Sequence, residues 1–233
     1  MAGKLYLIPN TLGSDVIEDS IPKNVANIAI NLSHFIVEDL RTARRFLRKL
    51  DRNFDIDSSN FYLLNKRTKP QEFIEFIKPL KAGKDMGIIS EAGCPGVADP
   101  GAEIVKLAHE NGITVVPLVG PSSILLALMA SGMNGQSFAF NGYLPINRDE
   151  RIKTIKDLEH LSRTKNQSQI FIETPYRNID FFNDILKACS PNTRLCVASN
   201  LTLEDEFVKT KKISQWKNIP DINKKPTIFI IHG

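Results

Sequence analysis

The segment of this chain with the clearest capacity for chemistry is a stretch rich in glycine and proline. It reads Ser90-Glu91-Ala92-Gly93-Cys94-Pro95-Gly96-Val97-Ala98-Asp99-Pro100-Gly101. Glycine lets a ligand approach the backbone closely, and proline fixes an irregular path. The stretch matches neither the phosphate-binding sequence that ends in Gly-Lys-Ser/Thr nor the GxGxxG fingerprint of dinucleotide enzymes. Its composition therefore fits a ligand-binding loop, and equally a long turn between a strand and a helix.

A second stretch, Val119–Ser123, lies between a predicted strand and a predicted apolar helix. Ser122 is a natural N-cap, and the start of a helix offers free N–H groups to a ligand. Taken alone, this stretch is more simply interpreted as a capped helix.

A third segment is strongly basic. In a helix, its arginines recur at positions i, i+3, i+4 and i+7 and form one stripe: Arg41, Arg44, Arg45 and Arg48. The opposite face is apolar and would pack inward: Leu40, Ala43, Leu47 and Leu50. Such a stripe could bind RNA phosphates, although a solvated helix face is the more common role of a charged run.

The elements that must position these segments alternate between strands and helices. The clearest predicted strands are Leu5–Pro9, Met86–Ser90, Ile113–Leu118, Gln169–Glu173, Arg194–Ser199 and Thr227–His232. The clearest helices are Ala102–Asn111, Ser122–Ser131 and Arg177–Ala188, with Ile124–Met129 apolar on all sides as in a buried helix. The alternation predicts an α/β fold with mostly parallel or mixed sheets covered by helices.

The remaining segments indicate where the chain forms loops and where one domain ends. Gly142–Arg151 is predicted to be a polar loop that enters a charged helix, Asp149–Leu161, and Arg163–Ser168 a surface connection. A domain boundary is predicted near residue 119. Because ligands of open α/β sheets lie beyond the carboxyl ends of strands, five loops are candidates: Asn10–Asp15, Glu91–Gly101, Val119–Ser123, Thr174–Arg177 and Asn200–Thr202.

Composition excludes several classes of protein. The 233 residues are 42% hydrophobic with a net charge of +4, which supports a packed core and permits a nucleic-acid partner without requiring one. We expect no membrane span, since the chain lacks an apolar run of about 18 residues, and no secretory signal at its start. Cys94, Cys189 and Cys196 show no metal-binding spacing, and scattered thiols favour the cytoplasm.

In order along the chain, these segments resemble the tetrapyrrole-methylase superfamily of S-adenosylmethionine enzymes. Within it they are most similar to the ribose-2′-O-methyltransferases that modify a cytidine of bacterial small-subunit ribosomal RNA. The most specific match is Ser90–Gly101 to Ser-Asp-Ala-Gly-Thr-Pro-x-x-x-Asp-Pro-Gly. The other matches are Leu5–Pro9, Glu38–Thr42 (to Glu-Asp-Thr-Arg), Pro117–Ser122 (to Pro-Leu-Pro-Gly-Pro-Ser), Phe140–Pro145 (to Phe-x-Gly-Phe-Leu-Pro) and Glu173–Arg177 (to Glu-Ser-Pro-His-Arg).

The resemblance implies two α/β domains, residues 1–118 and 119–233, in a homodimer, with S-adenosylmethionine in a cleft between them and S-adenosylhomocysteine as its product. The implied cofactor contacts are Pro9, Gly93, Cys94, Pro95, Ala98, Ser122, Ser123, Glu173, Leu201 and Thr227. The implied acceptor is ribosomal RNA or the small ribosomal subunit, held by the arginine stripe. Methyl transfer needs no metal, and a general base for a ribose hydroxyl would come from Glu38, Asp39 or Glu91.

The sequence also departs from the family at the implied substrate side. The family's Thr-Pro-Ile-Gly-Asn-Leu loop is Asn10–Asp15 here, its Glu-Leu-Thr is Asn200–Thr202, and its aspartate before Ala-Gly is Glu91. Longer members carry a C-terminal extension after the segment that matches Thr227–Gly233. Two alternatives stay open: methylation of a carbon on a tetrapyrrole precursor, and a non-catalytic protein that binds nucleotide-like ligands.

Overall fold

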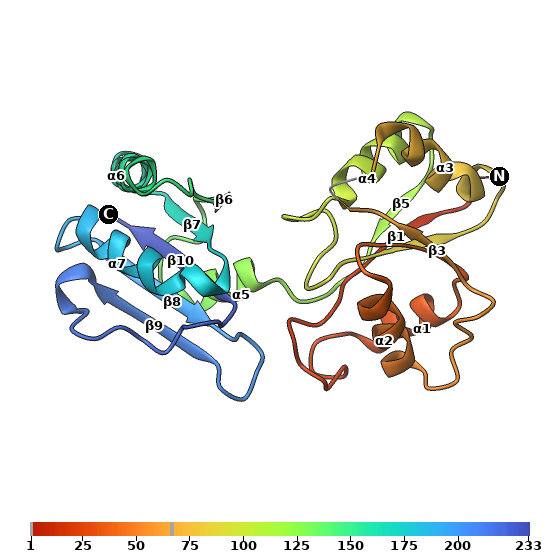
Figure 1. The fold of residues 1–233 in the computed structure, drawn as a ribbon, viewed down its shortest axis with the longest axis horizontal. Helices are drawn as coiled ribbons and strands as arrows, with labels where there is room; N and C mark the ends of the chain where they lie inside the picture. The colour runs from red at the N-terminus through yellow and green to blue at the C-terminus, as the bar shows by residue number, and fades with distance from the viewer. Residues whose placement is uncertain (1, 66–67) are drawn as a thin grey trace. The chain divides into compact units, whose positions relative to one another are not determined.

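The computed structural model describes residues 2–65 and 68–233, which divide into two compact units, Met1–Ser122 and Ser123–Gly233 (Figure 1). Each unit contains one five-stranded sheet covered by helices. The predicted α/β class is therefore confirmed. In the part of the chain that the structure describes, no helix has the length and apolar character needed to cross a membrane.

The sheet of the first unit is parallel throughout, in the order β3-β2-β4-β1-β5. Its strands are β1 (Leu5–Ile8), β2 (His34–Val37), β3 (Asn60–Leu63), β4 (Met86–Ile89) and β5 (Val115–Pro117). Its helices are α1 (Lys23–Ile30), α2 (Leu40–Leu50), α3 (Pro70–Lys81) and α4 (Gly101–Glu110).

Side chains that alternate along these strands build a core on each face of the sheet. Ile8 and Phe35 lie in a cluster with residues of α1 and α2, whereas Leu5 and Ile36 lie in a cluster with residues of α3 and α4. In Figure 1, accordingly, α1 and α2 cover one face and α3 and α4 the other. Because all five strands are parallel, the loops that follow them leave from one edge of the sheet.

The sheet of the second unit is mixed, in the order β6-β7-β10-β8-β9. Its strands are β6 (Phe138–Tyr143), β7 (Ser168–Ile172), β8 (Arg194–Ser199), β9 (Phe207–Lys212) and β10 (Thr227–His232). Only the β6–β7 pair is parallel; β10 runs antiparallel to β7 and β8, and β9 runs antiparallel to β8. The helices are α5 (Ser123–Ser131), α6 (Arg148–Lys165) and α7 (Asn178–Ala188), with short 3₁₀ turns at Pro175–Arg177 and Ile213–Gln215.

A buried ion pair joins the two long helices of this unit. Arg151 of α6 donates to Asp184 of α7 at 2.6 Å, and both side chains are buried. Arg148 reaches the second oxygen of the same carboxylate at 2.9 Å. Arg151 also donates to the carbonyls of Pro145 and Ile146, so the segment between β6 and α6 is fixed to α7.

Three sequence-based expectations about this unit are wrong. The helix at Ile124–Met129 is not buried, because α5 packs on the sheet through Ala127 and Leu128 and leaves Met129 78% exposed. Arg163–Ser168 is not a surface connection, because α6 continues to Lys165 and ends at Asn166 in the left-handed conformation. Gly142–Arg151 is only partly a loop, since β6 extends through Tyr143 and α6 begins at Arg148.

Candidate functional site

The glycine- and proline-rich stretch forms the loop between β4 and α4. Gly93, Gly96 and Ala98 all have positive φ angles, of 70°, 78° and 57°. Asp99 closes the loop by accepting hydrogen bonds from the backbone N–H groups of Gly101 at 2.7 Å and Gly96 at 3.3 Å. The Ser90 hydroxyl donates to the carbonyl of Gly93 at 2.6 Å. The loop is thus wound upon itself by its own polar groups.

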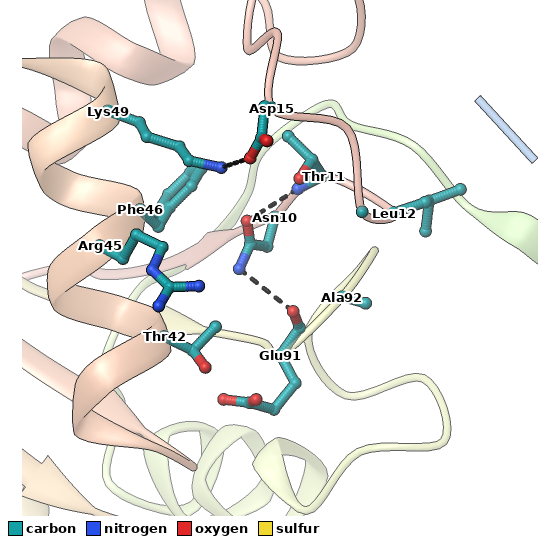
Figure 2. Close-up of a pocket in the computed structure, with 11 residues that line it drawn as sticks. Asn10, Thr11, Leu12, Asp15, Thr42, Arg45, Phe46, Lys49, Glu91 and Ala92 are labelled. Atoms are coloured by element: carbon teal, nitrogen blue, oxygen red, sulfur yellow. Dashed lines mark hydrogen bonds and ion pairs between the residues drawn. The ribbon is translucent and has the colours of Figure 1, made fainter. Parts of the chain in front are cut away.

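Asn10, the second residue after β1, fastens the loop after β1 to the one after β4. Its backbone forms a two-way bridge with Gly93, at 2.9 and 3.1 Å. Its side-chain amide donates to the carbonyls of Ser90 at 3.1 Å and Glu91 at 3.2 Å. Its side-chain oxygen accepts from the N–H of Thr11 at 2.8 Å (Figure 2). The sequence placed Asn10 in a candidate ligand loop, Asn10–Asp15, but did not predict that Asn10 joins this loop to the one after β4. The available signal was a polar amide that follows an apolar strand by one residue, where it needs hydrogen-bond partners.

The loop after β5 lies against the same two segments. The Cys94 thiol donates to the carbonyl of Pro121 with a sulfur–oxygen distance of 3.4 Å, and burial raises its pKa. Gly120 lies close to Pro9: a Cβ atom built on Gly120 would be 2.2 Å from Cγ of Pro9. Three segments far apart in the sequence therefore meet at one edge of the first sheet, as the loop rule predicts.

Beside this junction is a pocket of about 250 Å³ between the loop after β1, the loop after β4 and one face of α2 (Figure 2). Its lining combines both charges. The Lys49 ammonium contacts Asp15 at 2.5 Å, and Arg45 and Glu91 project from α2 and from the loop after β4. The pocket can receive a polar ligand of mixed charge; Lys49 and Asp15 were not among the predicted site residues.

The three carboxylates predicted as candidate bases differ in their surroundings. Desolvation raises the pKa of Glu91, and the nearby carboxylates of Asp39 and Asp99 raise it further, against hydrogen bonds from the Thr42 hydroxyl and the Asp39 backbone. Asp39 instead caps α2, accepting from the Thr42 N–H at 2.8 Å, and this bond holds its pKa below its usual range. Glu38 is half-buried just before the cap. Of the three, only Glu91 lines the pocket.

All four arginines of the predicted stripe are exposed on α2, but their contacts differ. Arg44 lies over the ring of Phe61, with its guanidinium carbon 5.3 Å from the ring centroid. Arg48 donates to the carbonyl of Arg52 at 2.7 Å, past the end of the helix. Arg45 lines the pocket, and Arg41 lies at the first turn of α2. The predicted apolar face is confirmed for Ala43 and Leu47, which are buried, whereas Leu40 and Leu50 are partly buried.

In the second unit, the antiparallel register places the start of β10 between the ends of β7 and β8. Ile228 pairs with Ile172, so Thr227 lies beside Glu173, and Thr227 pairs with Ser199. One oxygen of Glu173 accepts from the Thr174 N–H at 2.6 Å and from Arg177 at 2.5 Å.

The second carboxylate oxygen of Glu173 is buried without a partner among the described residues. The Thr227 hydroxyl donates to the carbonyl of Lys225 at 2.9 Å. Leu201 is buried just beyond the end of β8, and Ser122 and Ser123 are partly buried where α5 begins. The predicted residues Glu173, Leu201 and Thr227 therefore lie at one edge of the second sheet.

Within the described part of the chain, no three His, Cys, Asp or Glu side chains are grouped so that they could hold a metal ion.

Comparison with known proteins gives matches over most of the chain. Residues 19–216 match the model of a family described as Tetrapyrrole (Corrin/Porphyrin) Methylases. A protein of Streptococcus pyogenes named ribosomal RNA small subunit methyltransferase I is 31% identical over 92% of this chain and 70% of its own length. The Vibrio cholerae protein of the same name is 28% identical over 98% of this chain and 77% of its own length.

Two solved structures have the same fold at low sequence identity. The methyltransferase CobJ has a TM-score of 0.66 at 15% identity, covering 100% of this chain and 95% of its own. The uroporphyrin-III-C-methyltransferase from Thermus thermophilus has a TM-score of 0.60 at 16% identity, covering 100% and 93%. At such identities the likeness concerns the fold alone.

Proposed function

The chain belongs to the tetrapyrrole (corrin/porphyrin) methylases, a family of methyltransferases, and from this premise we propose that it transfers a methyl group from S-adenosylmethionine to a ribose 2′-hydroxyl of small-subunit ribosomal RNA. The observation that carries the proposal is the 31% identity to a curated ribosomal RNA small subunit methyltransferase over 92% of this chain. Action on ribosomal RNA would place the protein in the cytoplasm. A homodimer, implied by the family resemblance, belongs to the same proposal.

The residues present fit S-adenosylmethionine. The loop Glu91–Gly101 has left-handed backbone at Gly93, Gly96 and Ala98, and a path of this kind, with glycines that carry no side chain, lets a ligand approach the backbone closely. The unpaired buried oxygen of Glu173 needs a donor, and the adenine amino group or a ribose hydroxyl would supply one. We therefore propose that Pro9, Gly93, Cys94, Pro95, Ala98 and Ser122 contact the methionine and ribose parts, and that Ser123, Glu173, Leu201 and Thr227 contact the adenine end.

S-adenosylmethionine supplies a methyl group on a positively charged sulfur, which leaves as a neutral thioether in an in-line displacement. The protein must hold the acceptor oxygen in line with that methyl group and remove its proton. We assign removal of the hydroxyl proton to Glu91. Its raised pKa makes it a stronger base than an ordinary carboxylate, and it lines the pocket beside the loop after β4. The exposed Arg45 and Arg41 would bind the phosphates next to the acceptor ribose.

Replacing Glu91 with glutamine is expected to lower kcat by at least about 100-fold, the usual contribution of a general base, and to leave the Kd for S-adenosylmethionine unchanged. A base acts when deprotonated, so wild-type activity should fall as the pH drops through the pKa of Glu91. Since that pKa is raised, the fall in wild-type activity should begin at a pH above the usual glutamate pKa range. The residual activity of Glu91→Gln should not show this fall. Rates measured between about pH 5 and 9 test both points.

The matched control is Asp39→Asn, which keeps a good N-cap for α2 and should retain near-normal kcat. A large loss in this control together with full activity in Glu91→Gln would move the base to Asp39. Full activity in both variants would leave Glu38 as the remaining candidate.

The experiment that tests the proposed function is transfer of labelled methyl from S-adenosylmethionine to small ribosomal subunits isolated without the modification. Label should appear in RNA, in dinucleotides that resist alkaline cleavage because the 2′-hydroxyl is blocked, and S-adenosylhomocysteine should suppress it. Transfer to uroporphyrinogen instead of RNA would support the tetrapyrrole alternative. Binding of S-adenosylmethionine by calorimetry with no transfer to either acceptor would support the non-catalytic alternative.

A further inference from the structure

The outer strand of the second sheet carries an unusual concentration of positive charge. β9 lies at the edge of the sheet order and contains Lys209, Lys211 and Lys212, and Lys217 follows the next short turn. The whole segment 207–218 contains no aspartate or glutamate. β9 is labelled in Figure 1, where it runs along the outside of its sheet.

These lysines lie on both faces of the edge. Residues alternate along a strand, so Lys209 and Lys211 share one face and Lys212 lies on the other, directly across from Arg194 of β8. The Lys211 ammonium lies 5.2 Å from the ring centroid of Trp216, which itself packs edge-on against Phe182. This contact fixes the position of one charge on a rigid part of the fold.

The four lysines are not neutralised by the part of the chain that the structure describes. Among the residues that the structure describes, none of the four forms an ion pair, and the polar contact of the Lys212 ammonium is to the amide oxygen of Asn192 at 3.4 Å. The nearby Lys225, in contrast, contacts both Asp205 and Asp221. Lysine on an edge strand can also serve to prevent pairing with another chain, but Lys217 lies outside the strand, beyond the next short turn.

We propose that the β9 edge, defined by Lys209, Lys211, Lys212 and Lys217, binds the phosphate backbone of the RNA substrate, in addition to the arginines of α2. The inference rests on the proposed function, because the chemistry of the edge indicates only a polyanion and the ribosomal RNA supplies it. Ammonium groups on both faces of one strand can contact successive phosphates without reading bases. The edge therefore contributes affinity, and the acceptor pocket in the first unit determines which ribose is methylated.

The test compares the wild-type protein with a variant in which all four lysines are replaced by glutamine, K209Q/K211Q/K212Q/K217Q. The probe is small-subunit ribosomal RNA, titrated at several salt concentrations. We expect Kd to rise at least about tenfold near physiological salt, and the slope of log K against log salt to become shallower by about 3, since four phosphate contacts would be lost. Binding of S-adenosylmethionine, measured by calorimetry, should be unchanged.

The matched control removes four exposed lysines elsewhere, K81Q/K84Q/K153Q/K156Q, and so produces the same change in net charge. This control should bind RNA with nearly the wild-type Kd and slope. Equal losses in the two variants would overturn the inference, because the effect would then be one of overall charge. Full retention of RNA binding by the β9 variant would also overturn the inference. This holds even if light scattering shows that the variant self-associates, as a strand edge without its lysines could.

The failure of the proposed function has a different signature. If wild-type protein neither binds nor methylates RNA, the proposed function is wrong. The inference about the β9 edge then fails with it, because RNA is not a ligand of the protein. If wild-type protein methylates RNA and the β9 variant does so with unchanged KM, the function stands and the inference fails. Binding of wild-type protein to anionic phospholipid vesicles in preference to RNA would assign the edge to a membrane surface and would also contradict the inference.

Discussion

Replacing Gly120 with alanine is expected to weaken binding of S-adenosylmethionine about 100-fold, although the site of substitution is a single small residue. A Cβ atom at this position would lie 2.2 and 2.3 Å from two carbons of the Pro9 ring, and the ring cannot rotate away. Ordinary carbon contacts are about 3.5–4.0 Å, so either β1 or the loop after β5 must move by roughly an ångström. Overpacking of this kind costs about 1–3 kcal/mol, and where the cost falls on the segments that shape the cofactor site it corresponds to a loss of affinity of up to about 100-fold.

The measurements are calorimetry with S-adenosylmethionine and thermal unfolding. Overpacking typically costs about 1–3 kcal/mol, so Tm should fall by several degrees while the variant remains folded at 25 °C. Gly135→Ala is the control, because no atom lies within 4 Å of a Cβ at that position, and it should bind normally. Normal binding by Gly120→Ala would show that the contact between Pro9 and Gly120 has no part in shaping the cofactor site.

The fold class was predictable because both units repeat strands, loops and helices with strong hydrophobic patterns. β8 and β10 begin and end where the sequence predicts, since their β-branched and apolar runs are buried on both faces. The direction of the strands in the second sheet was less accessible. Alternation suggests parallel pairing, but β10 enters between β7 and β8 from the opposite direction, and only long-range packing determines this insertion.

The parts of the candidate site that depend on local backbone conformation were predictable from sequence motifs. The contacts between side chains far apart in the sequence were not. The glycines of the loop after β4 indicate an irregular path, and two of them do adopt left-handed backbone. The pairing of Asp15 with Lys49 connects residues 34 positions apart and has no local pattern. Likewise, Asp39 looked like a candidate base from its position, but its hydrogen bond to the Thr42 N–H shows a helix cap. Such assignments need the coordinates of neighbouring elements.

Replacing Asn10 with aspartate is expected to weaken binding of S-adenosylmethionine by roughly 10- to 100-fold. The substitution keeps the oxygen that accepts from Thr11 but removes the amide that donates to the carbonyls of Ser90 and Glu91. The buried carbonyl of Ser90 and the partly buried carbonyl of Glu91 would then face a carboxylate, and leaving a buried polar group unsatisfied costs about 1–3 kcal/mol. Since these carbonyls belong to the cofactor loop, the loss should appear in its conformation and in Kd.

Asn27→Asp provides the charge-matched control. Asn27 is exposed on α1, and its replacement by aspartate changes the net charge by the same amount. Calorimetry at two pH values adds a second criterion. A buried carboxyl has a raised pKa, and its protonated form can donate one of the two lost bonds, so the affinity of Asn10→Asp should recover partly as the pH is lowered. Wild-type affinity in this variant at neutral pH would contradict the role of Asn10 as the residue that fastens the loop after β1 to the cofactor loop. Affinity that is lost equally at both pH values would indicate that the backbone bridge between Asn10 and Gly93 has also broken, because protonation restores only the side-chain bond.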